Sequence, residues 1–66
     1  MIKMTKQDEE FLRKQLSNFD ELRQGTVDDL LSEVYDITLE GLDENDDPTD
    51  LYFEAQKAYD SIFLLN

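Results

Sequence analysis

Residues 26–42, which read TVDDLLSEVYDITLEGL, decide the fold of this chain. Apolar side chains recur there at intervals of three and four residues, which is the period of an amphipathic α-helix. Thr26 stands where a helix N-cap belongs, and Asp29 follows three residues later, as in a capping box. We therefore predict a helix over residues 27–42. Its apolar face consists of Val27, Leu30, Leu31, Val34, Thr38, Gly41 and Leu42, with Ile37 at the edge.

A strand is the alternative for the middle of this segment. Residues 34–39 alternate between apolar and polar side chains and include β-branched ones, both of which are typical of strands. The helical pattern nevertheless continues on both sides of residues 34–39, and this continuity favours the helix.

A second amphipathic segment precedes this one, over residues 5–23. Thr5 is placed to cap its N-terminus, and acidic residues fill the first turn, where a helix favours negative charge. The pair Ser17-Asn18 is the point at which this helix could break or bend. Its apolar face consists of Met4, Phe11, Leu12, Leu16, Phe19 and Leu22.

A third amphipathic segment covers residues 48–65. Asp47 is placed to cap it, with Pro48 in the first helical position, where a missing N–H does no harm. Three helices joined by short loops predict a single all-α domain over residues 1–66, an antiparallel three-helix bundle. The core stripe of the third helix consists of Leu51, Ala55, Ala58, Ile62 and Leu65, widened by Tyr52, Tyr59 and Phe63.

The composition excludes several kinds of chemistry. The chain has 66 residues and contains neither cysteine nor histidine. It can therefore form no disulfide and no zinc site of cysteine and histidine, and it lacks the commonest general acid/base. A domain of this size also has little room for a deep substrate cleft. We expect a protein that is not an enzyme and that holds no cofactor.

The sequence also favours a cytoplasmic location without membrane association. The longest apolar run covers residues 62–65, whereas a bilayer-spanning helix needs about 20 residues. Lys3 and Lys6 are not followed by the apolar run of a secretory signal.

The net charge of −11 is concentrated in one part of the chain. Residues 1–25 contain five acids and five bases, whereas residues 26–66 contain twelve acids and one base, Lys57. The acids of the middle helix are spaced by four, three, four and three residues, so they form one row, about 21 Å long, opposite the apolar face. This acidic row consists of Asp29, Glu33, Asp36, Glu40 and Asp43.

The acidic row predicts a partner-binding surface. Neighbouring carboxylates at these spacings destabilise a helix by a few tenths of a kcal/mol per pair, and no base in the helix compensates. Tyr35 and Leu39 lie beside the row, and aromatic side chains next to charge are typical of protein interfaces. The alternative is a solvated face that only keeps the protein soluble. The predicted binding residues are Asp29, Glu33, Tyr35, Asp36, Leu39, Glu40, Asp43, Glu44, Asp46 and Asp47.

The charge predicts a basic protein surface as the partner, including one that normally holds nucleic acid. Direct nucleic-acid binding is not expected, because phosphates would repel the chain. Duplex DNA carries one negative charge per ~1.7 Å of its axis, whereas the acidic row carries one per ~5 Å of helix. The acids of the following loop make this difference in charge density smaller. In general character the chain is similar to phage-encoded DNA mimics and anti-defence inhibitors, antitoxins and bacteriocin immunity proteins. That similarity implies an inhibitor or sequestering protein.

A calcium loop is one alternative function. Five residues between the second and third helices fall at EF-hand ligand positions, and they are Asp43, Asn45, Asp47, Thr49 and Glu54. Pro48, however, occupies the sixth position, where the loop requires the conformational freedom of glycine.

Self-association is the other alternative. Phe53 and Leu64 point away from the core stripe of the last helix, and Phe63 lies at its margin. Such leftover apolar surface predicts a homodimer or a helical adaptor module.

Overall fold

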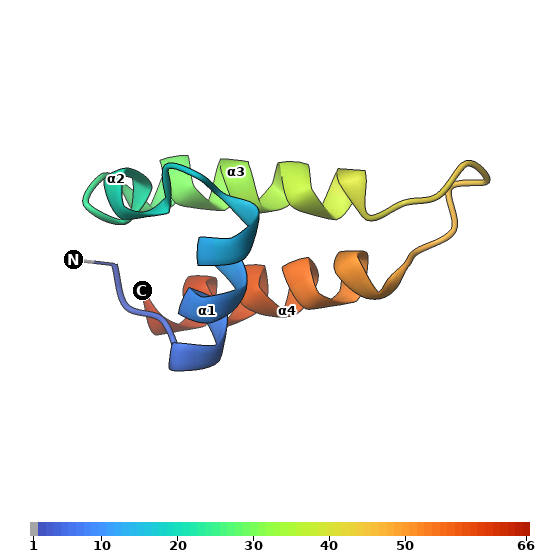
Figure 1. Ribbon diagram of the computed structural model, residues 1–66. Coiled ribbons are helices and arrows are strands. Elements are labelled where there is room, and N and C mark those ends of the chain that lie inside the picture. Colours follow the sequence, from blue (N-terminus) through green and yellow to red (C-terminus); the bar gives the residue numbers. More distant parts are fainter. Residues whose placement is uncertain (1) are drawn as a thin grey trace.

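The computed structural model describes residues 2–66 and confirms the all-α prediction (Figure 1). Helices α1 (Lys6–Gln15), α2 (Phe19–Arg23), α3 (Val27–Glu40) and α4 (Asp50–Leu65) follow one another along the chain. None of the helices in residues 2–66 is both long enough and apolar enough to cross a membrane.

Helix α3 forms where the pattern of residues 26–42 predicts it. The Thr26 hydroxyl accepts a hydrogen bond from the Asp29 N–H at 3.2 Å, as an N-cap should. The strand alternative for residues 34–39 is wrong. A helix buries Val34, Ile37 and Thr38 together, whereas a strand would turn Ile37 to the opposite side from the other two.

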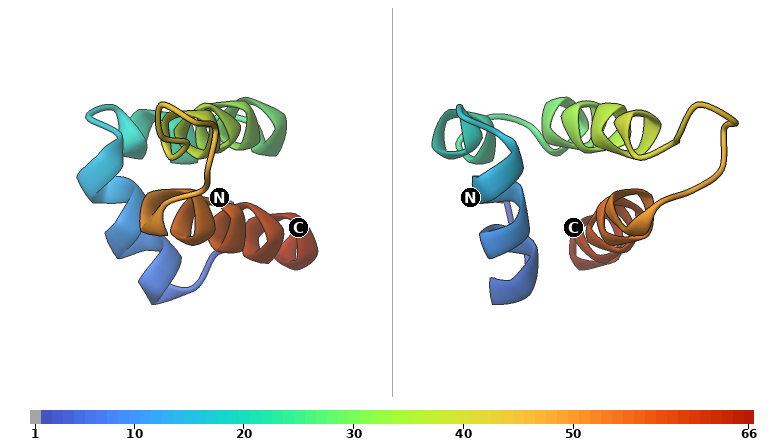
Figure 2. Two further views of the ribbon diagram at one scale, coloured as in Figure 1. Left: turned by 90° about the vertical axis from the view of Figure 1, so that its right-hand side faces the viewer. Right: turned by 45° about the vertical axis from the view of Figure 1, so that its right-hand side comes forward.

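Helices α3 and α4 run antiparallel, and the core lies between them and the N-terminal segment (Figures 1 and 2). Ala55 and Ala58 of α4 are buried, Ala55 in the core and Ala58 at the hollow between α1 and α4. The largest fully buried side chains come from each of α1, α2, α3 and α4, and they are Phe19, Leu12, Leu30, Ile62 and Val34. The apolar faces read from the sequence therefore form one core.

The predicted helix over residues 5–23 is wrong as a single element. Leu16 is extended, with φ −118° and ψ 115°, and separates α1 from α2. The following Ser17 and Asn18 favour turns because their side chains compete for backbone hydrogen bonds. The break lets α1 cross the hairpin steeply and contact α4, while α2 packs against α3 (Figure 2). Residues 2–66 consequently form four helices, and among these α3 and α4 are the antiparallel pair.

The segment between α3 and α4 is a tight reversal of the chain. Leu42 and Pro48 form an antiparallel bridge, and the Asp43 N–H donates to the Asp47 carbonyl at 3.0 Å. A three-residue loop closes the bridge, and Asp46 adopts φ 61° there, as the last residue of such loops commonly does.

The predicted N-cap of the last helix, Asp47, is wrong because the following Pro48 belongs to the bridge with Leu42 and not to the helix. Helix α4 begins at Asp50, after Thr49. The Thr49 hydroxyl does not cap α4 but donates to the Gly41 carbonyl at 2.6 Å, which holds the two ends of the loop together.

The C-terminal end of α4 is less buried than the sequence predicts. Leu65 and Phe63 were expected in or beside the core stripe but are 45% and 63% exposed. The core ends at Ile62 because no other element extends over the last turn. Instead, the Asn66 amide donates to the Lys3 carbonyl at 2.8 Å, which joins the two ends of the chain.

Candidate partner-binding groove

The two arginines of the N-terminal half form ion pairs within that half. Arg13 pairs with Glu9 at 3.2 Å and with Asp20 at 3.0 Å, and Arg23 pairs with Glu9 at 3.1 Å. Both guanidinium groups also face the ring of Phe19, at 5.1 Å and 6.0 Å from its centre. These contacts connect α1 to α2 and compensate the charges of Glu9 and Asp20.

These contacts also shift two pKa values. Hydrogen bonds from Arg13 and Arg23 lower the pKa of Glu9 below its ordinary value of 4.5. The hydrogen bond to Glu9, followed by that to Asp20, raises the pKa of Arg13. Both groups therefore stay charged over a wider pH range than they would alone.

The acids of α3 have no such compensation. Within residues 2–66, no lysine or arginine lies within ion-pair distance of an acid in α3 or α4. Asp29, Asp36 and Glu40 are exposed, whereas Glu33 is half-buried. Tyr35 and Leu39 are 55% and 51% exposed beside them. The outer face of α3 therefore combines unpaired carboxylates with two large exposed side chains.

The last member of the acidic row has a different environment. Asp43 lies beyond the end of α3, and its carboxylate accepts hydrogen bonds from the Asn45 and Asp47 N–H groups at 2.8 Å and 3.0 Å. The row along the helix itself therefore ends at Glu40. The loop acids Glu44, Asp46 and Asp47 are exposed beyond it.

The candidate calcium ligands also serve the loop. Asp43 accepts the N–H groups of its own turn, and Thr49 is bound to Gly41. In the part of the chain that the structure describes, no three acidic side chains are arranged so that they could hold a metal ion. These internal hydrogen bonds hold the loop in its conformation.

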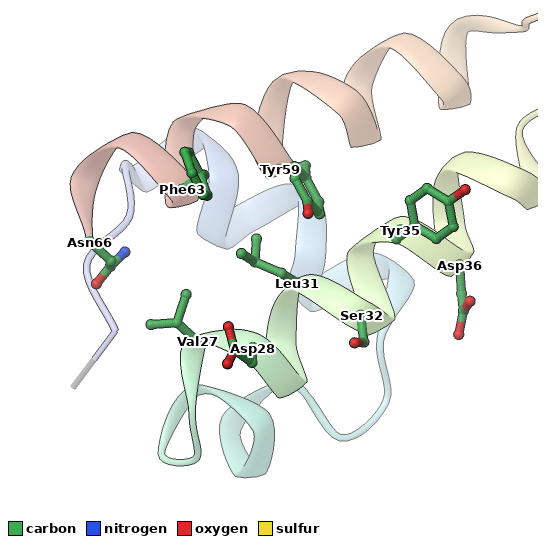
Figure 3. Close-up of a pocket in the computed structure, with 9 residues that line it drawn as sticks. All are labelled: Val27, Asp28, Leu31, Ser32, Tyr35, Asp36, Tyr59, Phe63 and Asn66. Carbon is green, nitrogen blue, oxygen red and sulfur yellow. The ribbon is translucent and has the colours of Figure 1, made fainter.

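An open groove of about 800 Å³ separates the first turns of α3 from the last turns of α4 (Figure 3). On the α3 side, Asp28, Ser32 and Asp36 follow one another at four-residue intervals and form a polar rim. On the α4 side, Tyr59 and Phe63 form an aromatic wall. The remaining lining residues are Val27, Leu31, Tyr35 and Asn66.

A smaller hollow of about 250 Å³ continues this groove toward the loop. It shares Tyr35 and Tyr59 with the first and is completed by Thr38, Tyr52, Gln56 and Asp60. Among the described residues that line either hollow, none is basic. We call the two together the α3–α4 groove.

The other side of α4 is different in charge. There, a hollow of about 270 Å³ lies between α1 and α4 and contains both acids and bases, among them Glu10, Lys14, Glu54 and Lys57. Lys57, the only base after residue 25, therefore does not face the α3–α4 groove.

The α3–α4 groove unites residues that the sequence assigned to two surfaces. Tyr35 and Asp36 were predicted to bind a partner and Phe63 to mediate self-association, yet all three line one groove. Phe53 and Leu64 lie outside its lining and are 56% and 81% exposed. The Phe53 ring meets Tyr52 edge-on, with 5.4 Å between ring centres.

Sequence reasoning missed Asp28, Tyr59 and Asp60 as groove residues. The four-residue spacing of Asp28, Ser32 and Asp36 is a readable signal, because it places the three on one side of a helix. Tyr59 was assigned to the core and is in fact half-buried, so it contributes to both core and groove.

The carboxylates lie at an open surface, where solvent keeps their charges screened and accessible. Comparison of the chain with protein-family models, curated proteins and solved structures finds no match.

Proposed function

We propose that this protein is a non-catalytic inhibitor or sequestering partner that binds a basic protein surface through the outer face of α3. One observation carries this proposal: Asp29, Asp36 and Glu40 are exposed and unpaired beside the exposed Tyr35 and Leu39. A lysine- or arginine-rich surface would supply the missing counter-charges.

The contrast between the two halves of the chain supports this proposal over simple solubility. In α1 and α2, Arg13 and Arg23 compensate Glu9 and Asp20 at distances of 3.0 to 3.2 Å. In α3, the repulsion between acids is left in place, although a domain this small has only ~3–5 kcal/mol of stability to spare. A charge surplus concentrated in residues 26–66 also speeds the approach of an oppositely charged partner.

A nucleic-acid-binding site is the kind of basic surface that this proposal favours, which makes the protein a DNA mimic. The exposed acids of the acidic row are followed along the chain by the exposed loop acids Glu44, Asp46 and Asp47, which extend the run of negative charge. A protein groove that holds phosphates would accept this run. Direct binding to nucleic acid is not part of the proposal, because the phosphates would repel it. Because the chain has no cysteine, it suits a reducing compartment, and we place its action in the cytoplasm.

The test is a charge-neutralised double variant with a matched control. Asp36→Asn/Glu40→Gln removes two unpaired acids from α3, and Glu10→Gln/Glu21→Gln removes two exposed acids from α1 and α2 that form no ion pair in residues 2–66. The partner captured from cells with the wild-type protein is purified, and its affinity for each variant is measured by calorimetry. We expect the α3 variant to bind at least ~10-fold more weakly, which corresponds to ~1.4 kcal/mol, and the control to bind like the wild type.

Two further readouts distinguish a DNA mimic from a general acidic ligand. Binding should weaken steeply as salt increases, and duplex DNA should compete with the protein for the same partner. If both double variants bind the purified partner as tightly as the wild type, the proposed function is wrong.

Self-association is a second candidate function. Phe53, Phe63 and Leu64 are more than half exposed on α4, which is unusual for three large apolar side chains on one helix. Sedimentation equilibrium at micromolar concentration decides it, since a homodimer has twice the mass of the chain.

A further inference from the structure

We infer that the α3–α4 groove receives one basic amphipathic helix of the partner, with an arginine seated against Tyr35 and Asp36. This inference rests on the proposed function, and it names the part of the partner that enters the groove. It draws on the shape of the groove, its charge, and a contact of the same kind inside this molecule.

The shape of the groove suits a helix. Its floor is apolar, with Leu31 buried and Val27 half-buried, and its walls come from two antiparallel helices (Figure 3). Helix α1 covers the opposite side of α4, so the hairpin is packed on one side and open on the other. An added helix would complete the layer in the way that amphipathic helices fill hydrophobic grooves. Strand addition is not available, because residues 2–66 contain no sheet edge.

The charge of the groove selects a cationic occupant over a second copy of this chain. Asp28 and Asp36 stand on its rim and Asp60 on its extension, and none of its described lining residues is basic. A second copy would bring a net charge of −11 and, after residue 25, only Lys57 to offset these acids. Two such grooves facing each other would place unpaired carboxylates together, which is unfavourable.

The tyrosines favour arginine over lysine. A guanidinium group is planar, stacks on an aromatic face and can form two parallel hydrogen bonds to a carboxylate, whereas an ammonium group is a compact charge. Tyr35 is 55% exposed, so its ring is free to receive such a group beside Asp36.

The molecule already uses this kind of contact. Arg13 lies 5.1 Å from the centre of the Phe19 ring and pairs at the same time with Asp20 at 3.0 Å. Phe19 and Asp20 are consecutive residues, as are Tyr35 and Asp36. The first aromatic-acidic pair holds an arginine of the same chain, and the second has no base near it in the described structure.

The spacing of the rim acids sets the spacing of the cations. Asp28 and Asp36 are separated by eight residues of one helix, a rise of about 12 Å. A helical occupant lying along the groove would therefore meet both with arginines spaced by about seven or eight residues, with apolar side chains between them on the same face.

The experiment uses the full chain, labelled with ¹⁵N, and a synthetic probe. The probe is an alanine-based helical peptide of about 18 residues with two arginines about eight residues apart and leucines between them. An amide NMR titration should shift Ser32, Tyr35, Tyr59 and Phe63. The same peptide with lysine in place of arginine should bind at least ~3-fold more weakly, the loss expected for a guanidinium–ring contact.

Two variants and one control locate the contact. Tyr35→Ala and Asp36→Asn should each weaken binding of the arginine peptide by ~3- to 10-fold, since each removes one half of the arginine site. Tyr35 and Asp36 are both exposed, so circular dichroism should show an unchanged helix content. Glu54→Gln removes one exposed acid from the hollow on the other side of α4 and should leave the affinity unchanged within twofold.

Three results would overturn the inference. The first is that the peptide shifts only amides on the α1–α4 side. The second is that the arginine and lysine peptides bind with equal affinity and that Tyr35→Ala does not change this affinity. The third is that the chain forms a homodimer whose interface maps to the α3–α4 groove. If one of these results is found but the purified partner still binds the Asp36→Asn/Glu40→Gln variant more weakly than the wild type, the proposed function is unaffected. If the partner binds that variant as tightly as the wild type, the proposed function itself is wrong.

Discussion

At Gly41 the backbone at the end of α3 passes so close to α4 that a single added carbon atom would not fit. A Cβ there would lie 2.4 Å from the Tyr52 nitrogen and 2.6 Å from its Cα. The φ of Gly41 is −77°, so the requirement is one of space and not of backbone conformation. The close approach also brings the Gly41 carbonyl within reach of Thr49, which binds it through both its N–H and its hydroxyl group.

Gly41→Ala should therefore destabilise the protein by ~2–3 kcal/mol, because the obstructing atoms belong to backbone and cannot turn aside. Gly25→Ala is the matched control, since a Cβ there would lie 3.4 Å from the Leu22 carbonyl oxygen, close but without severe overlap. We expect Gly25→Ala to change the free energy of unfolding by less than ~1 kcal/mol. Urea denaturation followed by circular dichroism measures both. Equal effects at the two glycines would show that the hairpin tolerates a wider separation.

At the scale of elements, the corner between α1 and α2 is held by charge as well as by apolar contact. Glu9 receives Arg13 from its own helix and Arg23 from α2, while Phe19 lies beneath both guanidinium groups. The corner therefore substitutes side-chain contacts for the backbone hydrogen bonds that the break at Leu16 removes. Among the carboxyl groups of this corner, Glu9 pairs with both arginines, whereas Asp20 pairs with Arg13 alone.

Glu9→Gln should lower the melting temperature at pH 7, and the difference from the wild type should vanish in acid. The pKa of Glu9 is lowered by the fold below its ordinary 4.5. A carboxyl group with a lowered pKa contributes stability above its unfolded pKa, and this contribution is lost as the pH falls through the folded pKa. Thermal melts between about pH 7 and pH 3 measure the difference.

Glu10→Gln serves as the control, because Glu10 is adjacent, exposed and forms no ion pair in residues 2–66. It should not reproduce the loss at pH 7. A pH-independent effect of Glu9→Gln would mean that Glu9 acts through packing and not through its charge.

At the scale of the whole molecule, the charges are close enough to act together. The chain measures 37 × 22 × 19 Å and carries a net charge of −11. At about 0.01 M salt the screening length is about 30 Å, so acids on α3, the loop and α4 repel one another across most of the molecule. Salt should therefore stabilise the free protein while it weakens binding to a basic partner.

We expect the melting temperature to rise by ~5 °C between about 0.01 M and about 1 M NaCl, the effect of ~1 kcal/mol on a domain of this size. The Asp36→Asn/Glu40→Gln variant should respond less, because two repelling charges are gone. Differential scanning calorimetry provides the measurement. A melting temperature that falls with salt would show that the ion pairs at the α1–α2 corner outweigh the repulsion elsewhere.

Sequence periodicity alone was sufficient for the all-α class and for most of the core, but not for the division between α1 and α2 or the start of α4. The caps at Thr5 and Thr26 and the burial of Leu30, Val34 and Ile62 follow from local patterns, because a helix depends on contacts between residues three or four apart. Local pattern also placed Tyr35 and Asp36 on the outside of α3. The row of acids could be read for the same reason, up to Glu40 where the helix ends.

Only the tertiary structure decided how these helices lie against one another. Ser17 and Asn18 marked where the first segment could break, but the angle between α1 and α2 depends on packing. The bridge between Leu42 and Pro48 depends on pairing that no short stretch of sequence specifies. The α3–α4 groove likewise brings Asp36 to Tyr59 and Phe63, more than twenty residues away in the chain. Residues so far apart meet only because the hairpin folds back on itself, and a helical period carries no information about that meeting.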